Sequence, residues 1–143
     1  EDTKIQKIKK FLEYDENTAG GLMTSEYVST SIDATVEQVI ENIKNVSHLH
    51  RSINFVYVVD NEGKFLGVVS LRRLLISSKN EIIKNLIKQA ENIPTATVGQ
   101  NVLEVASIIT KYNLFSVAVL DEEKKLLGVV TVDDIMRHFM PHA

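Results

Sequence analysis

Cysteine is absent from the 143 residues of this chain. Its absence excludes thiolate metal sites and cysteine nucleophiles, and it fits a protein of the cell interior. An excess of positive charge is also missing, because the formal net charge is −3 and no basic run stands out. We therefore do not expect nucleic acid as the main ligand, since proteins that bind it present a basic surface to the phosphate backbone.

Long hydrophobic runs and catalytic motifs are lacking as well. No apolar run approaches the about 20 residues that a membrane-spanning helix needs, and no signal peptide is visible. We therefore expect no direct membrane insertion. The sequence also has no Gly-rich P-loop, HExxH or GxSxG motif, and its carboxylates are scattered over turns and polar helix faces. These absences predict that the chain is not an enzyme.

The most informative feature that is present is an internal repeat. Nine of the fourteen residues at 56–69 are identical to their counterparts at 117–130, at an offset of 61. Further upstream, residues 27–32 match residues 93–98 at an offset of 66. The first repeat therefore carries five additional residues, which we place in the helix and loop around 46–51. A repeat of this kind predicts two similar supersecondary units.

Each repeat has the pattern strand, helix, strand, turn, strand, helix. The predicted strands are Val28–Ile32, Phe55–Val59, Phe65–Ser70, Thr95–Val98, Val117–Leu120 and Leu126–Thr131. Their valine-rich composition with little polar alternation predicts sheets covered by helices, and so a mixed α/β (α+β) fold. The polar runs at 60–63 and 121–124 predict hairpin turns.

Helix starts are indicated at three places. Thr35-x-x-Gln38 and Asn101-x-x-Glu104 both resemble capping boxes, in which side chains satisfy free backbone N–H groups. An apolar stripe within residues 5–12 predicts a further amphipathic helix at the N-terminus.

These motifs resemble a tandem pair of cystathionine-β-synthase-type regulatory modules, known as CBS domains or a Bateman module. The resemblance rests on residues 56–60 with 66–70 and on residues 117–121 with 127–134, and it covers about residues 20–140. Residues 12–24 (LEYDENTAGGLMT) are similar to the segment that joins an N-terminal helical domain to the CBS pair in the MgtE family of magnesium transporters.

The resemblance implies two pseudo-symmetric βαββα-like units, with residues 1–19 as N-terminal helix and linker, 20–78 as the first unit and 79–143 as the second. It further implies a cytoplasmic regulatory module that senses an adenine nucleotide (ATP, ADP or AMP) and Mg²⁺ for a divalent-cation transporter. The implied partners are a second copy in a homodimer, an MgtE-like N-terminal domain and a membrane transporter domain. Because the chain begins at Glu1 rather than methionine, we expect it to be part of a longer protein.

A nucleotide site is predicted after the last strand, where residues 128–134 read G-x-x-T-x-x-D at a helix start. Free N–H groups and the helix dipole favour a phosphate there. The Thr131 hydroxyl can donate to that phosphate and the Asp134 carboxylate can accept both ribose hydroxyls, which are the contacts that the resemblance implies for these residue types.

The resemblance also implies how the base is held. Thr95 and Ala96 supply backbone contacts to the base, Phe115 stacks on it, and Ile93 forms a wall on the other side. In the first repeat Arg73 stands where the aspartate would be, and it cannot accept hydroxyl protons. One nucleotide per chain is therefore expected, with Arg72 or Arg73 either reaching its phosphates or lying solvated on the surface.

Two alternatives stay open. Thr-x-x-Asp before an apolar helix is also a capping box that needs no ligand, and the CBS pair would then be a dimerisation or interaction scaffold attached to another transporter or a soluble protein. Candidate Mg²⁺ ligands are Asp15, Glu16 and Asp133, with further acids at 121–123, since Mg²⁺ prefers oxygen ligands and keeps several waters. For any one of these acids, the alternative is a solvated surface residue, which is the more common role of an exposed carboxylate.

Overall fold

The computed structural model describes residues 14–46 and 53–140. The amphipathic helix predicted within residues 5–12 and most of the five-residue insertion lie outside the described residues. Contacts divide the chain into two compact units. We call residues 26–93 with 123–126 the repeat-1 unit, and described residues 14–25, 94–122 and 127–140 the repeat-2 unit.

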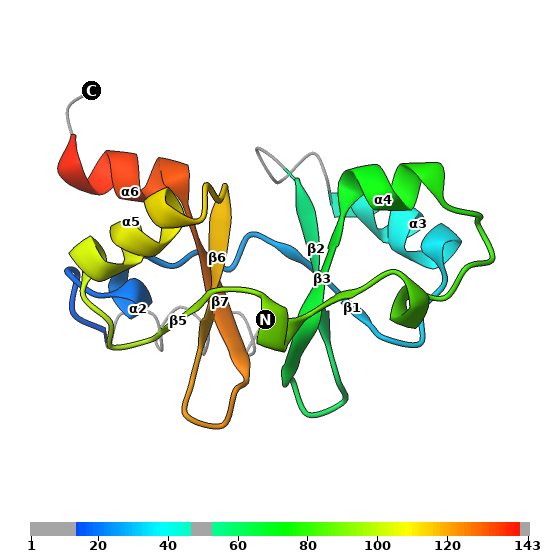
Figure 1. The fold of residues 1–143 in the computed structure, drawn as a ribbon, viewed down its shortest axis with the longest axis horizontal. Helices are drawn as coiled ribbons and strands as arrows, with labels where there is room; N and C mark the ends of the chain where they lie inside the picture. Colours follow the sequence, from blue (N-terminus) through cyan, green and yellow to red (C-terminus); the bar gives the residue numbers. More distant parts are fainter. Residues whose placement is uncertain (1–13, 47–52, 141–143) are drawn as a thin grey trace. The chain divides into compact units, whose positions relative to one another are not determined.

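The repeat-1 unit is a four-stranded sheet with helices, in the order β1-β2-β3-β4. Its elements are β1 (Val28–Ser31), α3 (Val36–Val46), β2 (Phe55–Val59), β3 (Phe65–Ser70), α4 (Leu71–Ile76), η2 (Ile83–Asn85), β4 (Lys88–Gln89) and η3 (Ala90–Asn92). β1 runs parallel to β2, whereas β2–β3 and β3–β4 are antiparallel. Figure 1 shows α3 and α4 on one side of this sheet.

The repeat-2 unit has a three-stranded sheet in the order β5-β6-β7. Its elements are α2 (Ala19–Leu22), β5 (Thr95–Thr97), α5 (Val102–Lys111), β6 (Ser116–Leu120), β7 (Leu126–Thr131) and α6 (Val132–Phe139). β5 is parallel to β6, and α2, α5 and α6 lie together on one side of the sheet (Figure 1). The predicted α+β class with two βαββα-like units is confirmed.

Strand pairing confirms the two different offsets of the repeat. Ser29 pairs with Tyr57 in the first sheet and Thr95 pairs with Ala118 in the second. The first-strand residues are 66 positions apart in sequence and their partners are 61 apart. The extra residues therefore lie between the first two strands of repeat 1, and the six predicted strands match the observed ones to within one residue at either end.

Of the capping boxes predicted at α3 and α5, the one at α3 forms. At α3 the Thr35 N–H donates to Gln38 Oε1 at 2.9 Å and the Gln38 N–H donates to Thr35 Oγ1 at 3.2 Å. At α5 the box is wrong, because Asn101 accepts from the Leu103 N–H at 2.8 Å instead. An asparagine side chain is short and bonds to the amide two residues on, as in an Asx turn.

Both hairpin turns form where the polar runs predict them. In the first, Asp60 Oδ1 accepts the backbone N–H groups of Glu62 and Lys64, and Gly63 adopts a φ of 85°. Lys124, its counterpart in the second repeat, adopts a φ of 67°. The second hairpin therefore keeps the positive φ of the first although it has a lysine in place of the glycine, and a positive φ is uncommon for residues other than glycine.

The segment that precedes each repeat packs against the other repeat. Residues 14–24 precede β1, yet Thr24 bridges to Val129 of β7 and the Ala19 N–H donates to the Gln100 carbonyl at 2.8 Å. In the same way, β4 precedes β5 but pairs with β3, where Gly67 faces Gln89. The periodicity of the sequence does not predict this pairing of each linker with the other repeat, because the pairing is between residues far apart in sequence.

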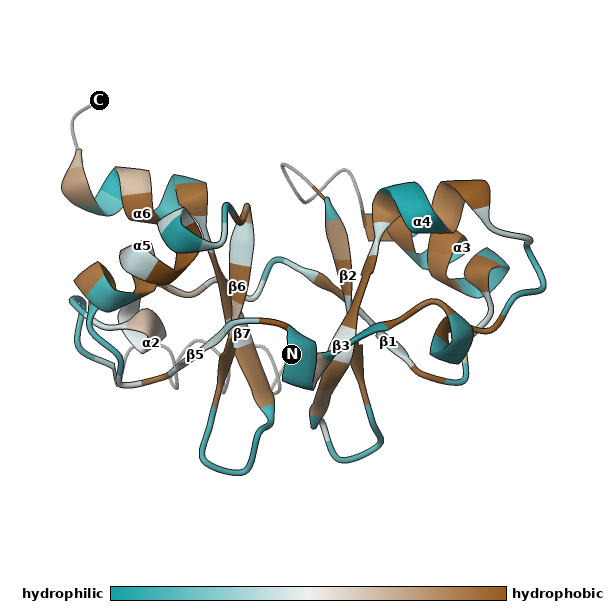
Figure 2. Cartoon of the chain, viewed as in Figure 1, coloured by the Kyte–Doolittle hydropathy of each residue, from teal (hydrophilic) through white to brown (hydrophobic). Residues whose placement is uncertain are grey.

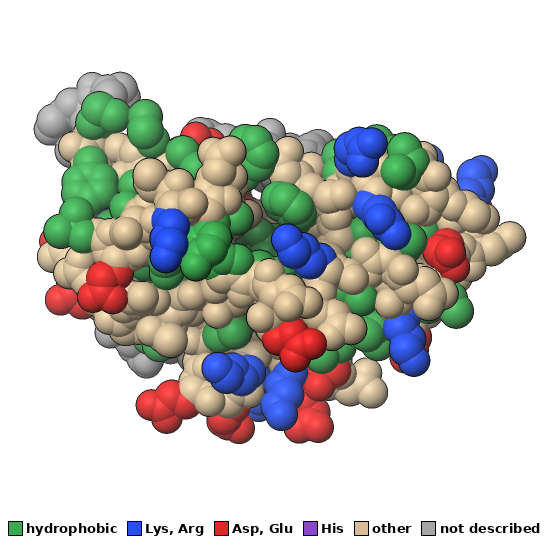
Figure 3. Space-filling model, viewed as in Figure 1, with side chains coloured by type: hydrophobic (Ala, Val, Ile, Leu, Met, Phe, Trp, Pro, Cys, Tyr) green, Lys and Arg blue, Asp and Glu red, His purple; other side chains and the backbone are tan. Residues whose placement is uncertain are grey.

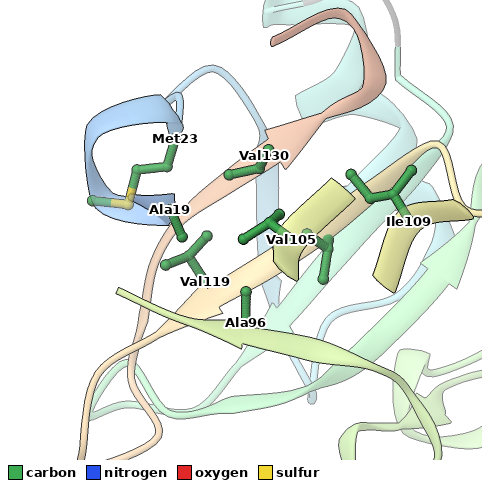
Figure 4. Packing of buried hydrophobic residues seen from close by; sticks show 8 residues of the cluster. Ala19, Met23, Ala96, Val105, Ile109, Val119 and Val130 are labelled. Atoms are coloured by element: carbon green, nitrogen blue, oxygen red, sulfur yellow. The ribbon is translucent and has the colours of Figure 1, made fainter. Parts of the chain in front are cut away.

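Each unit has its own apolar core. In the repeat-2 unit, Ala19 of α2 lies next to Val119 of the sheet, and Met23, just after α2, belongs to the same buried cluster as Val130 (Figure 4). In the repeat-1 unit the fully buried cluster includes Leu74 of α4 and valines of β1, β2, β3 and α3. Figure 2 shows hydrophobic strands and hydrophilic hairpin turns. The helices thus bury the strand residues that face them, and the last residues of β3 and β7 are outside the two cores.

Candidate functional site

The junction of β7 and α6 holds the two residues predicted to contact a nucleotide. The Asp134 N–H donates to Thr131 Oγ1 at 3.1 Å, and the Thr131 N–H donates to Asp134 Oδ2 at 2.9 Å. These reciprocal bonds are a complete capping box. The sequence motif therefore brings the hydroxyl and the carboxylate together at one helix start.

The second oxygen of Asp134 also has a partner. The Arg137 guanidinium donates from Nη2 to Asp134 Oδ1 at 2.8 Å. The Asp134 side chain is only 12 % exposed whereas that of Arg137 is 59 % exposed. The carboxylate is thus held at both oxygens, by a backbone amide within the protein and by a guanidinium at its surface.

Phe115 lies beside the same helix start. Its carbonyl accepts the N–H of Val132, the first residue of α6, at 3.0 Å, while its side chain is 64 % exposed. A large aromatic side chain that is exposed next to Thr131 is available to a planar ligand. The backbone of Phe115 is thus bonded to the start of α6, and stacking of its ring on a base stays a prediction.

The other predicted base contacts come from β5 and the residue before it. Thr95 and Ala96 pair with Ala118 and Val119 of β6, and the Ala96 side chain is buried, so only its backbone is available to a ligand. β5 is at one edge of its sheet. Ile93 follows η3, two residues before Thr95, and its contact with a base stays a prediction.

The capping box leaves part of the chemistry at α6 unused. The Thr131 hydroxyl accepts a hydrogen bond from an amide, so its proton is still available to donate. Each carboxylate oxygen of Asp134 accepts one hydrogen bond and has capacity for another. The amides of Val132 and Asp134, two of the first three of the helix, already donate within the protein. A phosphate would therefore be held chiefly by the hydroxyl and the helix dipole.

The equivalent place in the repeat-1 unit has a cap but no acid. Ser70 Oγ accepts the Arg73 N–H at 3.0 Å at the start of α4, as Thr131 does for Asp134. Arg72 and Arg73 are both exposed. Cap geometry is therefore common to the two repeats, whereas a carboxylate able to accept ribose hydroxyls occurs in the second alone.

The predicted Mg²⁺ ligands do not form a cluster. Asp15 Oδ1 accepts the Asn17 N–H at 2.7 Å, Glu16 is exposed, and Asp133 is exposed on the first turn of α6. Within residues 14–46 and 53–140, no three side chains of the types that bind metals come close enough to hold an ion. Binding of Mg²⁺ by these acids stays a prediction.

The sequence motif did not identify Arg137 as part of this site. The only available signal was the Asp-x-x-Arg spacing at 134–137, which places the two side chains on the same side of a helix. Such spacing is common on helix surfaces, so it becomes informative only when the acid is known to be nearly buried.

Comparisons with known proteins place these features in a family. The CBS domain model matches residues 19–80 and 83–141. The magnesium transporter MgtE of Enterococcus faecalis is 38 % identical over 130 residues, which are 91 % of this chain and 28 % of the transporter. The MgtE of Thermus thermophilus is 33 % identical with the same coverage. The chain thus spans less than a third of these relatives.

A solved structure is similar over nearly the whole chain. The cytosolic domain of the Mg²⁺ channel MgtE, solved in complex with ATP, superposes with a TM-score of 0.89 and is 30 % identical. The match covers 96 % of this chain and 55 % of that one. No helix among the described residues is both long enough and apolar enough to cross a membrane.

Proposed function

The chain belongs to the CBS domain family, as a tandem pair, and we propose that it is the cytoplasmic regulatory module of a magnesium transporter that senses an adenine nucleotide. The similar MgtE domain was solved with ATP, and the relatives with 33–38 % identity are magnesium transporters. In this proposal the module binds and responds and catalyses no reaction.

The observation that carries the proposal is the placement of Asp134. Its carboxylate is nearly buried and lies at the start of α6 beside the Thr131 hydroxyl. The carbonyl of Phe115, whose side chain is exposed, accepts a hydrogen bond from Val132 at the same helix start. An acid, a hydroxyl and an aromatic ring are the groups needed to bind a ribose, a phosphate and a base. The repeat-1 unit has Arg73 in place of the acid, which supports one nucleotide per chain.

A second copy of the chain is the partner that the exposed apolar residues support. Met136, Phe139 and Met140 are 50 %, 49 % and 47 % exposed, and Tyr112 at the end of α5 is 51 % exposed. Figure 3 shows hydrophobic side chains at the surface over α5 and α6. We propose that α6 and the Tyr112 end of α5 form a homodimer interface, while an N-terminal domain and the transporter domain are further partners. Mg²⁺ would then bind where acids of this chain meet acids of such a partner.

The direct test is thermal unfolding with ATP, ADP, AMP or S-adenosylmethionine, each with and without Mg²⁺. A ligand present at 100 times its dissociation constant stabilises the folded protein by about 2.7 kcal/mol, which is an easily measured shift. The proposal expects a shift with one adenosine ligand and its loss in Asp134→Ala. No shift with any of them would contradict nucleotide sensing.

One observation favours a second function, that of a scaffold without a ligand. The capping box and the ion pair already satisfy Thr131 and Asp134. A scaffold needs these residues only to start α6. In that case no nucleotide shifts the melting temperature, Asp134→Ala costs about 0.5–2 kcal/mol of stability as loss of a cap does, and dimer formation continues.

A further inference from the structure

The capping box at α6 does not need the ion pair between Arg137 and Asp134. Thr131 and Asp134 complete the box by themselves, since the backbone N–H of each donates to the side chain of the other. Arg137 instead holds the other carboxylate oxygen, Oδ1, at 2.8 Å. That oxygen is one of the two to which a ribose would donate.

The two repeats differ at both members of this pair. The counterpart of Asp134 is Arg73, and the counterpart of Arg137, at the same offset of 61, is Ile76. The cap hydroxyl by contrast occurs in both, as Ser70 and Thr131, and makes the same bond to the third residue of the helix. The arginine is therefore present in the repeat that has the acid and absent from the repeat that has the cap alone.

We propose that Arg137 is a positioning residue for ribose recognition, because it fixes the plane of the Asp134 carboxylate so that both oxygens face the two neighbouring hydroxyls of a ribose. This inference rests on the proposed nucleotide site. With Oδ2 bound to a backbone N–H and Oδ1 to a guanidinium, the carboxylate cannot rotate freely. Each oxygen still has one acceptor position, so the arginine orients the acid without occupying it.

An arginine is better suited than a lysine to orient a carboxylate, because of its geometry. A guanidinium is planar and directs its donors along fixed lines, whereas an ammonium group is a compact charge on a flexible stem. Only the first defines an orientation for its partner. Because Arg137 is 59 % exposed, water screens its charge, and its effect on a ligand is expected to come from orientation more than from attraction to phosphates.

The experiment compares a ribonucleotide with one that lacks the two hydroxyls. ATP and 2′,3′-dideoxyATP are titrated calorimetrically into the 143-residue chain, its Arg137→Gln and Arg137→Lys variants, and Lys111→Gln. The last removes the same charge from an exposed site on α5 of the same unit. Melting temperatures of all four proteins are measured, and because Arg137 is exposed, its variants are expected to fold.

Arg137→Gln is expected to raise the dissociation constant for ATP by about three- to tenfold, the usual effect of losing the pre-orientation of one side chain. The constant for dideoxyATP should change by less than about twofold, and Lys111→Gln should change both by less than about twofold. Arg137→Lys should lie between wild type and Arg137→Gln for ATP.

Three results would overturn the inference while leaving the proposed function intact. Equal losses for ATP and dideoxyATP would mean that Arg137 acts on phosphates through its charge. Unchanged affinity for ATP would mean that the ion pair is only a surface contact, and a gain would mean that Arg137 competes with ribose. If wild type binds no ATP, the proposed function itself fails and this role with it.

Discussion

At the scale of single residues, burial changes the acid–base behaviour of Tyr27. Tyr27 precedes β1, its ring makes an edge contact with Tyr57 at 5.6 Å between centroids, and burial raises the pKa of its phenol above the ordinary 10.0. The protein environment disfavours the phenolate, because a charged group loses hydration when it is buried. This side chain therefore makes folding depend on pH in the alkaline range.

The sign of that dependence follows from linkage. In the unfolded chain Tyr27 loses its proton near 10.0, but in the folded protein it does so only at a higher pH. Its contribution to the free energy of unfolding is complete below about pH 10 and is lost as the pH rises through the raised pKa. In denaturant unfolding between about pH 8 and 12, Tyr27→Phe should show a shallower alkaline decline than wild type, and identical declines would contradict this.

At the scale of secondary-structure elements, both repeats have a glycine at the same strand position, where the linker that precedes the other repeat passes close by. In β3, Gly67 has a φ of 151° and a side chain there would meet the Lys88 carbonyl of β4. In β7, a Cβ on Gly128 would lie 2.7 Å from the sulfur of Met23, just after α2. The glycine thus leaves room for a neighbouring segment in both repeats. That segment contacts Gly67 with its backbone and Gly128 with a flexible side chain.

Substitution of the two glycines should therefore have unequal effects. Gly67→Ala is expected to lower the free energy of unfolding by about 3 kcal/mol, since it combines backbone strain with overpacking. Gly128→Ala should cost about 1 to 2 kcal/mol, because the Met23 side chain can move. Denaturant unfolding measures both.

Gly99→Ala provides the matched control, because a Cβ there meets nothing within 4 Å. It should be neutral or stabilise by up to about 1 kcal/mol. If Gly128→Ala proved as costly as Gly67→Ala, the distinction between a backbone and a side-chain neighbour would be wrong.

The same elements show what the sequence could and could not predict. Strand positions, hairpins and the α3 cap followed from local patterns, because hydrophobic runs and turn residues act over a few positions. The short helix α2 and strand β4 did not, because they bond to residues far along the chain, as in Ala19 with Gln100 and Gln89 with Gly67. The Asn101 box failed because a similar spacing supports two kinds of cap.

The predicted site shows the same division between local and distant information. Thr131 and Asp134 are three residues apart, so their contact follows from helix geometry. The Val132 N–H, by contrast, donates to the carbonyl of Phe115, which lies before β6, and the spacing of the motif gives no sign of that bond.

At the scale of the whole molecule, the exposed apolar residues of α6 predict association. The chain of 16.1 kDa should sediment with about twice that mass, as two copies related by the commonest symmetry of oligomers. Phe139→Glu should shift the population toward one copy, because it places a charge on the proposed interface. Leu103→Glu, at the other end of α5 from Tyr112, is the control and should leave the mass unchanged. A wild-type chain that sediments as one copy would contradict the dimer.

The central claim is that each chain holds one adenine nucleotide through Asp134, and calorimetric titration of ATP into wild type and Asp134→Asn tests it most directly. Asparagine keeps an oxygen to accept the Thr131 N–H, so the cap survives while the charge is lost. We predict a stoichiometry of one per chain and an affinity lower by about 10- to 100-fold in Asp134→Asn, with little change in melting temperature. Equal affinity in the two proteins, or no binding to wild type, would contradict the account.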